Sequence, residues 1–146
     1  MTEISEYGVS LQLPGQWERT ESEQPGSLVY RDTEGDDTVT VMLLSVRPVY
    51  AIADKERLLG DYVQHRQKFE LGQRPSLQQS EPVTEDGNDS FEARWDGIDT
   101  ATGAQQRHRT ILSQNVLADF CYESPDTPLF AERVVALLAS ASVSAE

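Results

Sequence analysis

Short β-type segments, separated by turn-forming residues, fill most of this 146-residue chain. Residues 8–13 alternate apolar and polar side chains and stop at Pro14-Gly15, which is typical of a half-buried strand that ends in a turn. Further segments of this type cover residues 27–31, 38–46, 77–83, 90–98, 104–113 and 116–122. Because short turns join the last four, they predict an antiparallel meander. Residues 38–46 are apolar or β-branched on both faces, which predicts a central strand covered on both sides.

Residues 51–69 have a helical period in place of the strand period. The apolar side chains at this spacing are Leu58, Leu59, Tyr62, Val63 and Phe69. They predict an amphipathic helix laid on the sheet and ended by Gly72 and Pro75. A second helix is predicted from the capping signal that begins at Ser124 to about Ser140, before a tail that frays.

This element order predicts a single α+β domain over residues 1–146, with an ordered core at about residues 7–140. The expected architecture is an antiparallel sheet of about six to seven strands flanked by two helices. A chain of this length buries roughly two-thirds of its surface on folding, so its core needs no disulfide or metal. The single cysteine also excludes an intramolecular disulfide.

The charge balance restricts the class of partner. The chain has 12 Lys and Arg against 25 Asp and Glu, a formal net charge of −13. Such a chain repels phosphate backbones and anionic lipids, which argues against binding to nucleic acid or to a membrane surface. We therefore expect a cationic protein partner; the oligomeric state is left open.

The first six residues carry neither a basic nor an apolar signal region, and no apolar run approaches the ~18 residues of a membrane span. The lone cysteine suits a reducing compartment. A cytoplasmic location is expected, although a mature exported chain without its leader would look the same.

Acidic side chains gather in the predicted turns and at strand ends. Carboxylates that share one side of a protein steer cationic partners to that surface. The candidate protein-binding residues are Asp32, Glu34, Asp36, Asp37, Glu85, Asp86, Asp89, Asp96 and Asp99. A solvated acidic coat has the same composition, so both interpretations stay open.

Cys121 and His108 are the candidate catalytic residues. A two-residue turn at Gln114-Asn115 would pair them directly across a hairpin. An imidazole that takes the proton of a neighbouring thiol activates it as a nucleophile. No third orienting group is identifiable, and a register change of one residue would separate the pair. The alternative is that Cys121 is a small buried apolar residue and His108 lies on the sheet surface.

Other chemical motifs are missing from the sequence. Residues 32–37 lack the glycine and glutamate that an EF-hand loop requires, and no zinc-ligand spacing occurs. There is no phosphate loop, dinucleotide fingerprint or serine elbow. Phe91 and Trp95 share one strand face, where they form either core or a stacking platform for a ligand. No metal or cofactor is expected, and an enzyme is the minority interpretation.

The opening residues 7–17, with an aromatic, an alternating strand, Pro14 and Trp17, resemble the PsbP and DcrB-like superfamily. The C-terminal part also resembles this superfamily, since the apolar strand 117–122 leads into a predicted helix that ends near Ser140. The resemblance implies an α/β/α sandwich and a mostly non-enzymatic role. Family members include photosystem subunits, lipoproteins and the Eag-type adaptors of type VI secretion. The missing leader and lipidation cysteine favour the cytoplasmic branch.

Together these features predict a non-catalytic bacterial protein that binds a toxin or secreted effector, as an immunity protein or as an Eag-like adaptor. One alternative is a subunit of a housekeeping assembly, which the neighbouring genes would reveal. The other is a cysteine hydrolase that uses Cys121 and His108.

Overall fold

The protein is described here from a computed structural model. The described residues are 2–13, 15–20, 26–33, 36–46, 51–86, 91–113, 116–125 and 141–143. The helix predicted to follow Ser124 falls on residues 126–140, which lie outside this set.

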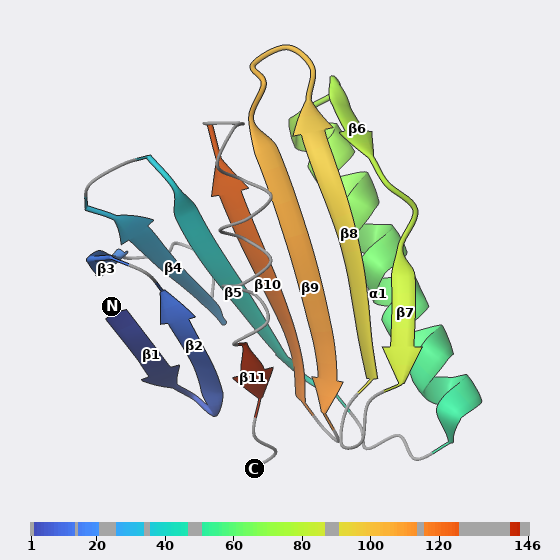
Figure 1. Cartoon of the computed structure of the whole chain (residues 1–146). Coiled ribbons are helices and arrows are strands. Elements are labelled where there is room, and N and C mark those ends of the chain that lie inside the picture. The colour runs from blue at the N-terminus through green and yellow to red at the C-terminus, as the bar shows by residue number, and fades with distance from the viewer. Residues whose placement is uncertain are drawn as a thin grey trace.

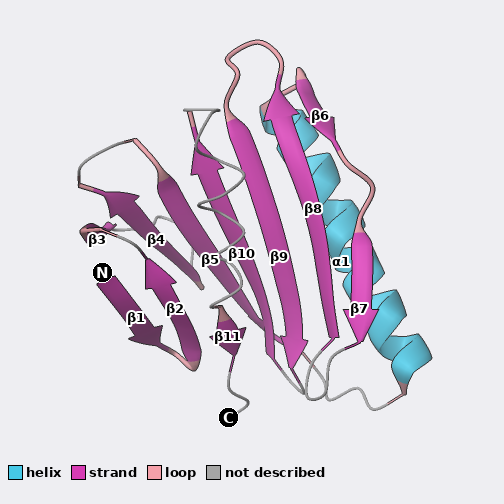
Figure 2. Ribbon diagram, viewed as in Figure 1, coloured by secondary structure: helices cyan, strands magenta, loops and turns pink. Residues whose placement is uncertain are grey.

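Eleven strands and one helix make up the described part of the chain (Figures 1 and 2). In chain order they are β1 Thr2–Glu6, β2 Val9–Leu13, β3 Trp17–Thr20, β4 Ser27–Asp32, β5 Thr38–Ser45, α1 Ile52–Gln73, β6 Leu77–Gln79, β7 Val83–Asp86, β8 Phe91–Asp99, β9 Gln105–Ser113, β10 Val116–Ser124 and β11 Ser142–Val143.

The main sheet has eight antiparallel strands in the order β3-β4-β5-β10-β9-β8-β6, with β7 also paired to β8. A separate three-stranded sheet has the order β1-β2-β11. Figure 1 shows α1 along the β6–β8 side of the main sheet, and the small sheet near β4 and β5.

Two apolar clusters lie on opposite faces of the main sheet, because successive side chains of a strand point to opposite sides. On β10, Phe120 and Tyr122 belong to the cluster under the small sheet, where Leu11 and Leu13 of β2 meet them. Leu117 belongs to the cluster under α1. The other members of that cluster include Leu59, Val63, Phe91, Ala93, Trp95 and Leu112. Phe91 and Trp95 are therefore core residues.

The structure confirms the meander, the position of the first helix and the antiparallel sheet. The helix ends at Gln73, and the Arg74 N–H caps it by donating to the Glu70 carbonyl. The β9–β10 register pairs His108 with Cys121 as predicted, and Ser113 with Val116. No helix of the described residues is long and apolar enough to cross a membrane.

The strand number differs from the prediction of six to seven. β1 was not predicted, and it pairs with β2 in the small sheet. β3 was not predicted either; it pairs with β4 and buries Trp17, while Glu18 and Arg19 are exposed. The strand predicted over residues 77–83 is split in two. The Ser80 N–H donates to the Asp96 carbonyl, but the Asp96 N–H donates to the Ser80 hydroxyl in place of a backbone carbonyl, and Pro82 has no N–H to donate.

Two predicted faces also differ. β5 is buried on one face only, since Thr38, Thr40 and Met42 are half-buried and Leu44 is exposed. Phe69 of α1, predicted to face the sheet, is exposed as well. The helix turns polar side chains toward the sheet in its second half, and this arrangement forms the candidate site.

Candidate functional site

A stripe of polar side chains on α1 faces the sheet. Tyr62, Arg66, Glu70 and Arg74 follow one another at intervals of four residues, so they share one side of the helix. They meet polar residues of β9 and β10 that point to the same face. We call this group, with its partners Gln106, His108, Thr110, Asp119, Cys121 and Glu123, the buried polar cluster.

Asp119 is the centre of the cluster and is only 1% exposed. Its Oδ2 accepts from the Tyr62 hydroxyl at 2.8 Å and lies 3.2 Å from Arg66 Nε. Its Oδ1 accepts from the Thr110 hydroxyl at 3.2 Å and lies 3.5 Å from His108 Nδ1. Burial would raise the pKa of Asp119, but His108, Arg66 and Tyr62 together lower it, so the carboxylate is held ionised.

Gln106 determines the protonation of His108. The Gln106 amide nitrogen faces two carboxylates, at 3.2 Å from Glu70 and 2.8 Å from Glu123. A carboxylate only accepts, so this nitrogen is fixed as the donor and Oε1 is turned to His108 Nε2 at 3.2 Å. The Nε2 atom must then carry a proton.

The second ring nitrogen of His108, Nδ1, faces the ionised Asp119 and carries a proton too. His108 is therefore an imidazolium, although it has no exposed surface. Burial would lower the pKa of His108, but the charges of Cys121 and Asp119 and their hydrogen bonds raise it to about 10. The Trp95 ring stacks on the imidazolium with centroids 3.8 Å apart, an arrangement that favours the cation.

Cys121 completes a row of thiol, imidazole and carboxylate. Its Sγ lies 3.4 Å from His108 Nε2, and Asp119 lies on the other side of the ring. Such a row activates a nucleophile. The thiol residue is only 8% exposed, and Tyr62 of α1 bonds the adjacent Asp119. A bulky acyl substrate therefore does not reach the sulfur while α1 is in place.

Asp119 is the third group that the sequence analysis did not identify. A period of two along a strand places residues 119 and 121 on the same face, and a charged residue inside an apolar strand is unusual. Those two signals were sufficient to find it. Gln106 and Arg66 gave no comparable signal, because their roles depend on how α1 lies over the sheet.

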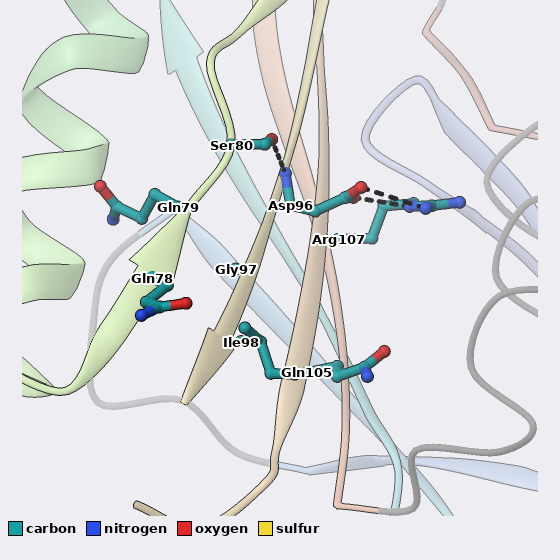
Figure 3. Close-up of a pocket in the computed structure, with 8 residues that line it drawn as sticks. All are labelled: Gln78, Gln79, Ser80, Asp96, Gly97, Ile98, Gln105 and Arg107. Carbon is teal, nitrogen blue, oxygen red and sulfur yellow. Dashed lines mark hydrogen bonds and ion pairs between the residues drawn. The ribbon is translucent and has the colours of Figure 1, made fainter. Parts of the chain in front are cut away.

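A second concave region lies at the β6–β8–β9 end of the sheet (Figure 3). This pocket of about 370 Å³ is lined mostly by polar side chains and includes no member of the row formed by Cys121, His108 and Asp119. Asp96, a predicted protein-binding residue, lies here and is paired with Arg107 at 2.6 Å. The uncharged Ser80 hydroxyl accepts from the Asp96 N–H at 2.8 Å.

The other predicted acidic residues are placed as follows. Asp37 is buried and accepts from Tyr122 and Ser124. Asp32 and Asp99 are also buried, and Asp99 accepts from the Ala101 N–H at 2.9 Å. Glu85 pairs with Arg94, and Asp36 is exposed. Glu34 and Asp89 lie outside the described residues, and Asp86 is described only in its backbone, as the end of β7.

These carboxylates do not share one patch. Figure 1 shows the end of β4 and the β8–β9 turn at one end of the main sheet and the end of β7 at the other. In the described residues we find no group of three or more His, Cys, Asp or Glu arranged to hold a metal ion.

Comparison with solved structures shows a PsbP-like fold. The solution structure of cyanobacterial PsbP (CyanoP) from Synechocystis sp. PCC 6803 superposes with a TM-score of 0.72 at 12% identity, covering 98% of this chain and 92% of that one. A crystal structure from Bacteroides thetaiotaomicron VPI-5482 gives 0.51 at 11% identity, covering 95% of this chain and 46% of that one. No family model and no curated protein matches the sequence.

Proposed function

We propose that this chain is a non-catalytic protein-binding module of the bacterial cytoplasm that holds a cationic toxin or secreted effector. Its two versions are a type VI secretion-associated immunity protein and an Eag-like adaptor. The mostly non-enzymatic superfamily that the sequence resembles supports a binding role.

The observation that carries this proposal is the uncompensated negative charge. The arginines that pair with carboxylates of the chain itself are Arg57, Arg66, Arg74, Arg94, Arg107 and Arg109. Among the described residues these six arginines are thus paired internally, while the formal net charge of the chain is −13. Such a field attracts a basic protein and accelerates its association.

The surface best suited to the partner is the half-exposed face of β4 and β5, beside α1. It presents Val29, Thr40, Met42 and Leu44, and the exposed Glu18 of β3 and Arg31 of β4 lie opposite each other on the same face. The described residues place no helix or strand over it. We call this surface the β5 strip. The apolar and hydroxyl side chains suit an apolar segment of the partner, and the net charge of the whole chain attracts the partner's basic residues.

The experiment starts from the partner that the tagged protein retains from its native lysate, identified by mass spectrometry and then purified. Leu44→Arg is expected to weaken the purified complex by at least about tenfold, because it places a bulky cation in the β5 strip. The matched control is Ile98→Arg on the opposite face of the sheet. Leu44 is 43% exposed and Ile98 38%, so neither change disturbs the core. Equal binding by the two variants, or an empty lysate lane, would contradict the proposal.

Salt distinguishes the two versions when the complex is measured at about 50 and about 500 mM, because added salt shortens the reach of exposed charges. An immunity complex steered by carboxylates associates more slowly at high salt, whereas an apolar contact with an adaptor hardly changes.

The second candidate is a cysteine hydrolase that acts on a small substrate, favoured by the row of Cys121, His108 and Asp119. Cys121→Ala separates the two functions. A binding module keeps its partner and its cellular phenotype after this change, and a hydrolase keeps the partner and loses the phenotype.

A further inference from the structure

The sulfur of Cys121 lies beside a cation that nothing in the proposed binding role uses. His108 Nε2 is 3.4 Å from Sγ and carries a proton, as its contact with the Gln106 carbonyl requires. His108 is fully buried, and its other nitrogen makes no conventional hydrogen bond among the described residues, only the ionic contact with Asp119. A protonated ring nitrogen is therefore fixed in position against the sulfur.

We propose that Cys121 and His108 form a thiolate–imidazolium pair that reacts with small hydroperoxides, and that Cys121 is a site of oxidation to sulfenic acid. The inference is independent of the proposed binding partner. It also differs from acyl hydrolysis, because its reactant is small enough to reach a nearly buried sulfur.

The reaction with hydrogen peroxide balances within the pair. The thiolate sulfur donates an electron pair to one peroxide oxygen, an S–O bond forms and the O–O bond breaks. The sulfur is oxidised to sulfenic acid, and the second oxygen is reduced to hydroxide. Hydroxide takes the Nε2 proton of His108 and leaves as water, and the imidazole becomes neutral.

The fold gives the sulfur a route to solvent. Cys121 is the register partner of Thr40 on β5, and both side chains point to the face that carries α1. Thr40 is half-buried and belongs to the β5 strip. Cys121 therefore lies at the border between the covered and the open part of this face. The remaining 8% exposure of Cys121 is small, so a reactant of a few atoms suits this position better than a peptide.

The test compares one chain in its native and its urea-denatured state near neutral pH. Each sample receives hydrogen peroxide and a sulfenic-acid trap, and the labelled Cys121 peptide is quantified by mass spectrometry. A free thiol is only a few per cent thiolate near neutral pH, so the native chain is expected to react at least about fivefold faster than the denatured chain. A native rate equal to or below the denatured rate would overturn the proposal, because burial would then protect an ordinary thiol.

Two controls isolate the pair. The native protein is expected to show ultraviolet thiolate absorbance near neutral pH that Cys121→Ser removes, and its absence from the native spectrum would also overturn the proposal. His108→Gln keeps a polar side chain in the sheet and is expected to reduce the native rate to that of the denatured chain. If this variant does not fold, the absorbance and the native-to-denatured ratio of the unaltered chain still decide the matter.

Discussion

Replacing Asp119 with alanine is expected to lower the free energy of unfolding by about 3–5 kcal/mol, the usual cost of removing one partner from a buried ion pair. The change leaves His108 and Arg66 without the carboxylate that lies against both of them. It also removes the acceptor of the Tyr62 and Thr110 hydroxyls. His108 and Thr110 are fully buried, so water does not replace the carboxylate at these two groups.

Urea unfolding of Asp119→Ala beside Asp61→Ala measures this effect. Asp61 is an exposed carboxylate on α1, and its loss is expected to stay within about 0.5 kcal/mol. If Asp119→Ala does not fold, Asp119→Asn keeps one acceptor oxygen and is expected to be less destabilised. A loss of less than about 1 kcal/mol for Asp119→Ala would show that the cluster is not held by this carboxylate.

Trp95→Ala is expected to cost about 3–5 kcal/mol, because it leaves a large cavity in the core. Trp95 is 2% exposed, packs in the cluster under α1 and covers one face of the His108 ring. The loss therefore combines apolar burial with the contact between the indole and the imidazolium.

The matched control is Phe69→Ala on α1, which removes an aromatic ring that is 48% exposed. Phe69 contributes a contact with Arg66 at 5.5 Å but little buried surface, so its loss is expected to stay below about 1.5 kcal/mol. Both variants are measured by urea unfolding. Equal losses would mean that the stack beside His108 adds nothing and that the core tolerates the cavity.

Local patterns in the sequence were sufficient for most of the fold. The alternation in residues 8–13 and the helical period in residues 51–69 both mark real elements, because each pattern reflects one buried face. The pairing of His108 with Cys121 followed from a two-residue turn alone. Residues 77–83 were less predictable, because the bond from Ser80 to Asp96 depends on a strand that lies far along the chain.

The buried polar cluster was predictable only in part. The sequence placed the thiol and the imidazole together, and one of its two interpretations put His108 on the sheet surface, whereas the structure buries it. The helix was expected to present Phe69 to the sheet, and it presents Arg66 and Glu70. The period of apolar residues cannot identify a polar helix side that faces the sheet, because ion pairs with a distant strand stabilise that side. The predicted acidic residues show the converse, since Asp32, Asp37 and Asp99 are buried while turn composition suggested exposure.

NMR of the His108 ring nitrogens tests most directly whether the cluster is built around a buried cation. The chain has two histidines, and His65→Gln changes the exposed one, so a single imidazole signal remains. Because the pKa of His108 is raised to about 10, both ring nitrogens are expected to be protonated at neutral pH. The ring is expected to lose one proton only near pH 10. A neutral ring near pH 7, with one bare nitrogen, would contradict the charged cluster and the thiolate pair that depends on it.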